Sequence, residues 1–170
     1  MHNSIKIYKV LSNILLPIGY LFGFFDVLFL LSAFTNPEAL IFVFAIASLV
    51  FYIFISHRFC QKGILSEQSF SSKTKDWIKV NAIVSLILCT LFLLNGLSIL
   101  ATSDAKLLQF IEEKAKVTPG IPADFNMNLL VSVTKKVSAV LLFTGLAGLP
   151  QIILTFRFLK QYSYLFEETL

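Results

Sequence analysis

The stretch that decides the fold is residues 10–34, which reads VLSNILLPIGYLFGFFDVLFLLSAF and contains a single charge, Asp26. A helix needs about 20 residues, at about 1.5 Å each, to cross about 30 Å of hydrocarbon. Three further runs of suitable length, residues 39–56, 80–101 and 137–156, contain no Asp, Glu, Lys or Arg. Backbone in lipid must satisfy its own hydrogen bonds, so each run should be helical. The sequence predicts an all-α integral membrane four-helix bundle with up-down-up-down topology.

The composition excludes most other protein classes. Of the 170 residues, 56% are hydrophobic and 14% are charged, and the mean hydropathy is +0.80. An ordinary soluble domain has about a quarter charged residues. One core of this size cannot bury so much apolar side chain, so part of it should face lipid. With two Cys and five Pro, the chain offers no disulfide framework and no low-complexity tract.

The connections predict a single membrane domain, residues 1–170. The first two spans are separated only by residues 35–38 and should form a hairpin. Asn36 is a suitable N-cap, Pro37 suits the first helical position, and Glu38 suits the positive first turn of the second helix.

The two longer connections carry different signals. The inner loop, residues 57–79, is rich in Ser and Lys, and Gly63 should end the second helix there. The outer loop, residues 102–136, should contain a short helix with an apolar face. That face consists of Leu107, Phe110 and Ile111. We expect it to cover the top of the bundle rather than to lie on the outer membrane surface, because the opposite face has mixed charge.

Polar residues mark the expected helix starts in these loops. Ser71 or Ser72 can cap the third span and Ser103 the short outer helix. Asp124 can cap a helix that continues into the fourth span.

The distribution of basic residues predicts that both termini are cytoplasmic. With the N-terminus inside, nine of the 14 basic residues are on the inner side: Lys6, Lys9, Arg58, Lys62, Lys73, Lys75, Lys79, Arg157 and Lys160. The other five are in the outer loop: Lys106, Lys114, Lys116, Lys135 and Lys136. Aromatic residues suited to the inner interface are Tyr8, Trp77, Tyr162 and Tyr164.

We therefore expect an integral protein of a bacterial inner membrane or its equivalent. The first apolar run exceeds the about 7–15 residues of a cleavable signal, so it is interpreted as a retained anchor. The net charge of +4 is assigned to topology and to anionic lipid head groups rather than to nucleic acid. The inner loop could also bind anionic lipid or a cytosolic partner.

Each span has one stripe of small or polar residues, which is how most membrane helices pack. The stripe on the first span includes a GxxxG pair. The candidate helix-packing residues are Gly19, Gly23, Ser48, Ser85, Gly96 and Gly148.

Asp26 is the exceptional residue of these spans. It lies about 25 Å along the first helix from Lys9, beyond the middle of the span. An ionised carboxylate there costs at least about 2.5 kcal/mol, so the neutral acid or a bonded partner is favoured. No Lys, Arg or His lies within a span. The expected hydrogen-bond partner is Asn95, at nearly the same depth on the third span, with Thr144 as the weaker candidate.

Three interpretations of Asp26 remain open. The favoured one is a structural clasp with a neutral carboxyl group. The second is a proton or cation site formed by Asp26 with Asn95, Thr144 and Gln151. The third is an oligomer contact through the adjacent GxxxG face.

Motifs for catalysis and for metal or cofactor binding are missing. His2 and His57 are far apart in sequence, and Cys60 and Cys89 form no CxxC pattern. There is no phosphate-binding glycine loop, no GxSxG and no HExxH. We therefore expect no enzyme activity, no metal and no cofactor, and the sequence identifies no small-molecule substrate.

Two classes of function remain. The favoured class is a non-enzymatic accessory, regulatory or interaction subunit that packs, through small and polar helix faces, as a homo-oligomer or within a larger membrane complex. The alternative is a small proton-coupled or cation-conducting transporter or channel that uses Asp26 as an oligomer.

Overall fold

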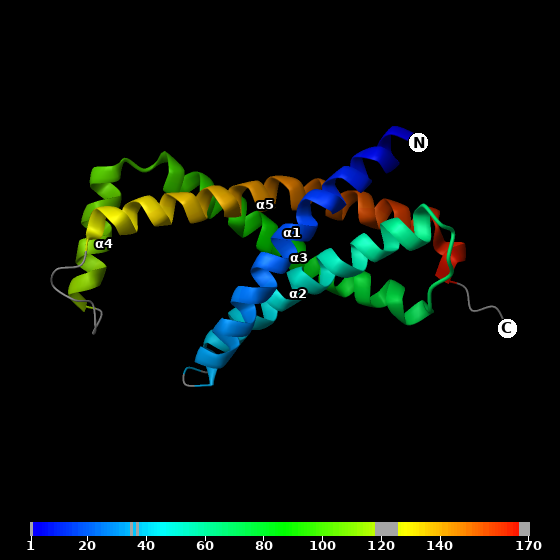
Figure 1. The fold of residues 1–170 in the computed structure, drawn as a ribbon, viewed down its shortest axis with the longest axis horizontal. Coiled ribbons are helices and arrows are strands. Elements are labelled where there is room, and N and C mark those ends of the chain that lie inside the picture. The colour runs from blue at the N-terminus through cyan, green and yellow to red at the C-terminus, as the bar shows by residue number, and fades with distance from the viewer. Residues whose placement is uncertain (1, 35, 37, 118–125, 167–170) are drawn as a thin grey trace.

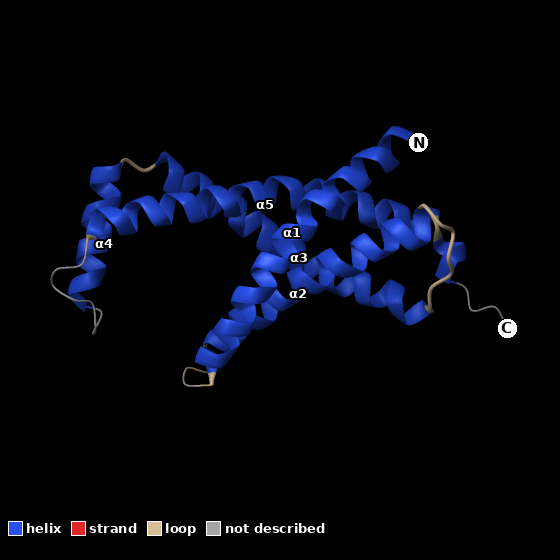
Figure 2. Ribbon diagram, viewed as in Figure 1, coloured by secondary structure: helices blue, strands red, loops and turns tan. Residues whose placement is uncertain are grey.

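The computed structural model describes residues 2–34, 36, 38–117 and 126–166, and within these ranges it is helical and contains no strand (Figure 2). The four long helices are α1 (His2–Ala33), α2 (Ala39–Arg58), α3 (Ser72–Ala101) and α5 (Met127–Gln161). The shorter elements are a π-helical turn (Phe59–Ile64), α4 (Asp104–Val117) and a 3₁₀ turn (Ser163–Phe166). All four long helices are long and apolar enough to cross a membrane. The predictions of an all-α fold and of four long apolar helices are confirmed.

The long helices form two pairs, α1 with α2 and α3 with α5 (Figure 1). The pairs contact each other through α2 against α3 and α1 against α5. The start of α1 and the 3₁₀ turn lie toward the same end, which we call the terminal end (Figure 1). The connection between α1 and α2 and the helix α4 lie at the opposite end, which we call the open end.

Two groups of buried side chains hold the helices together. The group at the terminal end includes Tyr8, Phe59, Cys60, Ile78, Phe158 and Leu165. The central group includes Leu15, Leu49, Tyr52, Ala82, Cys89 and Ile152. Both groups draw on the long helices of both pairs, so the pairs are joined from the terminal end to the middle.

Gly63 does not end the second helix, and that prediction was wrong. The chain continues beyond α2 as the π-helical turn Phe59–Ile64, with Gly63 inside it. A Cβ atom on Gly63 would lie 2.9 Å from Phe59 and 3.1 Å from Phe70, so the position has no room for a side chain. Ring contacts join Phe59, Phe70 and Phe166, at centroid distances of 5.4 to 6.3 Å. The glycine therefore serves aromatic packing rather than helix termination.

Two of the expected helix starts, at Ser71 and Ser103, directly precede the first residues of α3 and α4. Ser71 is the N-cap residue of α3, with its hydroxyl 3.1 Å from that of Thr74. Asn126 caps α5, because its Oδ1 accepts a hydrogen bond from the Leu129 amide at 3.2 Å. The expected cap Asp124 lies outside the described residues.

The connection between α1 and α2 is as short as predicted. The Glu38 amide donates to Asn36 Oδ1 at 3.3 Å, and the Ala39 amide donates to Asn36 O at 3.0 Å. Asn36 thus satisfies backbone groups ahead of α2, although α2 itself begins at Ala39 after Glu38. Pro37 lies outside the described residues.

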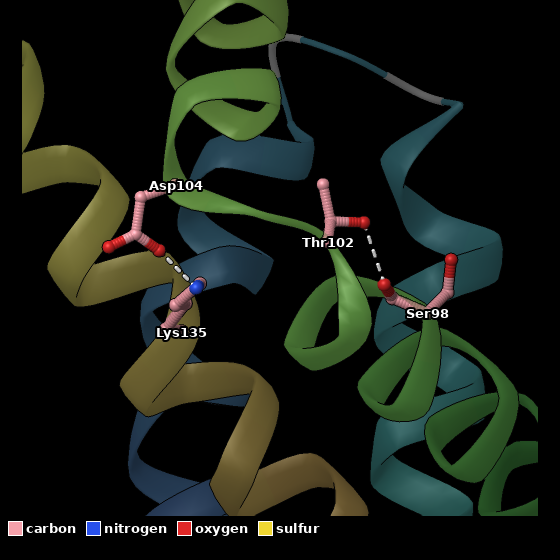
Figure 3. Close-up of polar contacts among 4 residues, drawn as sticks. All are labelled: Ser98, Thr102, Asp104 and Lys135. Carbon is pink, nitrogen blue, oxygen red and sulfur yellow. Dashed lines mark hydrogen bonds and ion pairs between the residues drawn. The ribbon is translucent and has the colours of Figure 1, made fainter.

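The helix α4 packs against the start of α5 rather than over all four long helices (Figure 1). Leu107 is buried, at 7% exposure, whereas Phe110 is 56% exposed. Asp104 forms an ion pair with Lys135 of α5, and the Thr102 hydroxyl donates to Ser98 O at 2.8 Å (Figure 3). The expectation that this helix covers the top of the bundle is wrong, because α4 packs mainly on α5.

The backbones of α3 and α5 approach closely at three glycines. A Cβ atom on Gly145 would lie 2.7 Å from Cys89 O, and one on Gly148 would lie 2.6 Å from Cys89 Sγ. On α3, a Cβ atom on Gly96 would lie 3.0 Å from Ser138 O. Glycines at such positions allow membrane helices to make close van der Waals contact. Gly96 and Gly148 are among the predicted packing residues, whereas Gly145 is not.

The GxxxG pair of α1 faces α2 of the same chain. A Cβ atom on Gly19 would lie 2.9 Å from Ile53 Cγ2, and one on Gly23 would lie 3.4 Å from Val50 Cγ1. This face is therefore covered within the chain, which leaves it unavailable for an oligomer contact in this conformation.

Gly145→Ala should lower the free energy of unfolding by about 1–3 kcal/mol, because the methyl group must displace a backbone carbonyl of α3. Gly23→Ala is the matched control, since its nearest contact of 3.4 Å is an ordinary one. The control should change stability by no more than about 1 kcal/mol. Detergent unfolding in mixed micelles, followed by circular dichroism, measures both variants. Equal effects would contradict the close α3–α5 packing.

Candidate functional site

The two helix pairs diverge toward the open end (Figure 1). Phe22 of α1 stacks on Phe92 of α3, with ring centroids 5.8 Å apart. Next to this contact a cavity of about 340 Å³ is lined by residues of all four long helices. Its aromatic lining consists of Phe22, Phe25, Phe29, Phe42 and Phe92. Its remaining lining residues are Asp26, Ile46, Val137 and Leu141. We call this cavity the hairpin cleft.

The size of the side chains on α1 explains the divergence. Before Phe22, α1 contributes fully buried Ser12 and packs Gly19 closely on α2. In its second half, the residues directed at the cleft include Phe22, Phe25 and Phe29. Small residues let membrane helices approach, and bulky ones hold them apart. The cleft is therefore a property of the sequence of α1.

Asp26 is the one polar residue among those that line the hairpin cleft. Its Oδ1 atom is buried and has no hydrogen-bond partner in the described part of the chain. Lys136 of α5 lines a neighbouring cavity of about 230 Å³, but no ion pair joins it to Asp26. A buried polar atom without a partner is unfavourable by about 1–3 kcal/mol. The carboxyl group is thus an unused hydrogen-bonding group in an apolar cleft.

The predicted hydrogen bond between Asp26 and Asn95 is wrong. Asn95 is exposed on the outside of α3, and its Nδ2 donates to Leu91 O one turn earlier, at 2.8 Å. The adjacent Gly96 faces α5, and successive side chains differ by about 100° around a helix, so Asn95 points elsewhere. Similar depth therefore does not bring these two side chains together.

The other two candidates for a polar path lie apart from Asp26. Thr144 is buried, and its hydroxyl donates to Val140 O of its own helix at 2.8 Å. Gln151 is fully buried, and its Nε2 donates to Ser56 Oγ of α2 at 3.2 Å. The structure thus distributes the four residues of the predicted proton or cation site over separate environments.

The other candidate packing residues, Ser48 on α2 and Ser85 on α3, differ in how deeply they are buried. Ser85 of α3 is fully buried, and its hydroxyl has no partner among the described residues. Ser48 of α2 is half-buried. Together with the glycines, these positions mark contacts within the chain.

A second polar group joins α1, α2 and α5 within the buried interior. The Tyr52 hydroxyl lies 2.7 Å from Thr155 Oγ1, which in turn lies 3.0 Å from the Tyr8 hydroxyl. The Tyr8 hydroxyl also donates weakly to Ser56 O, at 3.4 Å. All four residues are buried. We call Tyr8, Tyr52, Ser56, Gln151 and Thr155 the tyrosine junction.

Sequence reasoning found only part of this junction. Tyr8 was expected at the membrane interface but is fully buried. The sequence does contain a pattern that predicts the junction: each of the three helices carries two hydrogen-bonding residues four positions apart. These pairs are Tyr8 and Ser12, Tyr52 and Ser56, and Gln151 and Thr155. Residues four apart share one helix face, so each pair turns two polar groups toward the same neighbour.

No protein-family model, curated protein or solved structure matches this chain. Within the described residues, no group of three or more His, Cys, Asp or Glu side chains could hold a metal ion. The hairpin cleft and the tyrosine junction are therefore interpreted from their own geometry.

Thr155→Val should lower the free energy of unfolding by about 1–2 kcal/mol, because two buried tyrosine hydroxyls lose a shared partner. Thr90→Val is the matched control, since the Thr90 hydroxyl is exposed and bonds only Leu86 O of its own helix. The control should stay within about 0.5 kcal/mol of the native value. Unfolding in mixed micelles measures both, and equal losses would contradict the junction.

Asp26→Leu should raise the stability of the isolated chain by about 1–3 kcal/mol, because it removes a buried oxygen that has no partner. Most substitutions do the opposite. The same unfolding measurement applies. A loss of stability would show that the carboxyl group is bonded within the chain and would contradict the structure of the cleft.

Proposed function

We propose that this chain is a non-enzymatic, four-span integral membrane protein that acts as an accessory or regulatory subunit. In this proposal the spans run up-down-up-down with both termini cytoplasmic. A transmembrane helix of a different membrane protein packs against the open side of the hairpin cleft and inserts side chains into it. The observation that carries the proposal is the partnerless carboxyl oxygen of Asp26 in an open cleft lined by phenylalanines.

Membrane insertion is supported by the outward faces of the long helices. Large apolar side chains are exposed on each of them, for example Phe24, Ile41, Leu94 and Ile153. Monomeric soluble proteins rarely expose apolar patches larger than a few hundred Å². Lipid tails are the medium that accommodates such faces along the full length of a helix.

The cytoplasmic placement of the termini is supported by the residues near the terminal end. Trp77 and Tyr164 are exposed there, and amphipathic rings favour the membrane interface. Lys75, Lys79 and Lys160 lie in the same region, and cytoplasmic segments carry an excess of Lys and Arg.

The residues that line the hairpin cleft determine which kind of helix can bind there. A partner helix must offer apolar surface to the phenylalanines and a cationic or hydrogen-bonding group to Asp26. A second copy of this chain has no Lys, Arg or His to offer within the apolar runs 10–34, 39–56, 80–101 and 137–156. Ionisable residues inside membranes pair with one another, so a Lys or Arg at middle depth in a foreign helix is the complementary group.

Two features of the fold make a different interface less suitable. The glycine faces that commonly join membrane helices are already covered, by α2 on α1 and by the α3–α5 contact. The transporter alternative has no supporting arrangement, because Asn95 and Gln151 lie apart from Asp26. The hairpin cleft, by contrast, is unfilled and contains a carboxyl oxygen without a partner.

The test measures energy transfer between the full chain, carrying a fused donor fluorophore, and a labelled synthetic helix in phosphatidylcholine vesicles. The helix consists of about 20 residues, mostly Leu, with one central Lys. A second helix has Leu in place of that Lys. We expect transfer to the Lys helix to exceed transfer to the Leu helix several-fold, because only the former supplies a partner for Asp26.

Substitutions in the chain sharpen this experiment. Asp26→Leu should abolish the preference for the Lys helix, Asp26→Asn should reduce it, and the exposed control Glu38→Gln should retain it. Equal transfer to both helices, or a preference that survives Asp26→Leu, would overturn the proposal. Association of two copies of the chain that depends on Asp26 would also overturn it, because the occupant would then be a second copy.

A further inference from the structure

A second cavity, of about 310 Å³, lies near the terminal end between α3 and the end of α5. It is separate from the hairpin cleft and shares no residue with it. Its lining consists of Lys75, Lys79, Phe156, Leu159, Lys160 and Ser163. We call this cavity the lysine pocket.

Three ammonium groups from two helices are brought together in this pocket. Lys75 and Lys79 are one turn apart on α3, and Lys160 is on α5. In the sequence these bases indicate orientation and a general attraction to anionic lipid. Nothing there pairs Lys79 with Lys160, because about 80 residues separate them. The packing of α3 against α5 brings Lys75, Lys79 and Lys160 to one cavity and so concentrates positive charge there.

The charge of the pocket is only weakly neutralised. Lys79 Nζ lies 3.7 Å from Asp76 Oδ1, and both side chains are largely solvent-exposed, so this pair is weak. Lys75 Nζ lies over the ring of Phe166, 5.7 Å from its centroid, which holds the side chain without removing its charge. Within the described residues, Lys160 forms no ion pair. An anion would therefore meet Lys75 and Lys160 together with Lys79, whose pairing with Asp76 is weak.

The pocket also has an apolar side. Phe156 and Leu159 lie on the part of α5 that precedes Lys160, toward the hydrocarbon. Basic pockets between membrane helices on the cytoplasmic side bind the phosphate-containing head groups of anionic lipids. A lipid matches both sides of this pocket, whereas a free phosphate ion matches only the lysines.

We propose that the lysine pocket binds the phosphate group of an anionic membrane lipid. The ammonium groups of Lys75, Lys79 and Lys160 surround the phosphate oxygens, and the Ser163 hydroxyl can donate a further hydrogen bond. The acyl chains continue along Phe156. This inference does not depend on the partner helix of the hairpin cleft.

The test uses a fluorescent reporter in the pocket wall. The full chain carries Phe156→Trp in a Trp77→Phe background, which leaves one tryptophan in the protein. It is reconstituted in phosphatidylcholine vesicles that contain rising fractions of brominated phosphatidic acid, and brominated phosphatidylcholine serves as the reference lipid. We expect stronger quenching by phosphatidic acid at every equal fraction, because the bromine atoms are drawn to the pocket.

Lysine substitutions define the residues responsible. Lys160→Gln should weaken the apparent affinity about fivefold, and the triple change Lys75→Gln, Lys79→Gln and Lys160→Gln should weaken it about a hundredfold. The matched control removes the same charge from α4, through Lys106→Gln, Lys114→Gln and Lys116→Gln, and should leave quenching unchanged. Circular dichroism verifies that each variant is folded.

Three results would overturn the proposal. Equal quenching by the two brominated lipids would show no selectivity for the anionic head group. An equal loss in the α4 control would show that overall charge, and not the pocket, attracts the lipid. Displacement by millimolar inorganic phosphate, beyond that caused by chloride at the same ionic strength, would indicate a site for the free anion.

Discussion

The distance between neighbouring helices, which the size of the facing side chains sets, is the constraint on which this structure depends. Where Gly145 and Gly148 face Cys89, the backbones of α3 and α5 nearly touch. Where Phe25 and Phe29 project from α1, the helix pairs separate and leave the hairpin cleft. In the proposed membrane setting, helix association gains little from hydrophobicity, so this difference in packing decides which surfaces close and which remain open.

The fold combines this packing with directional contacts in the buried interior. The tyrosine junction joins α1, α2 and α5 through Thr155, and the aromatic rings of Phe59, Phe70 and Phe166 pack together at the terminal end. The ion pair between Asp104 and Lys135 holds α4 to α5. The two pairs are therefore held together along part of their length, and Asp26 lies in the part where they separate.

The long helices could be predicted because apolar runs of sufficient length have one stable backbone conformation in lipid. Helix rotation could not be predicted equally well. Asn95 and Asp26 have similar predicted depths in their helices, which suggested that they face each other. The close contact of Gly96 with α5 fixes the rotation of α3, however, and Asn95 therefore points outward. The prediction that Gly63 ends the second helix failed for a related reason. The role of Gly63 depends on its contact with Phe70, and the sequence alone does not show that Phe70 packs against the π-helical turn. Candidate residues on single helices were identifiable, whereas the sites that several helices build were not.

The hydroxyl of Thr155 carries a single hydrogen but has three acceptors nearby. These acceptors are Gln151 O at 2.9 Å, the Tyr8 hydroxyl at 3.0 Å and the Tyr52 hydroxyl at 2.7 Å. Each hydroxyl can rotate, so several proton arrangements satisfy the same heavy-atom positions. A slight tilt of α1 can therefore exchange one arrangement for another without leaving every group unbonded. The junction thereby tolerates small motions that a fixed pattern of donors and acceptors would resist.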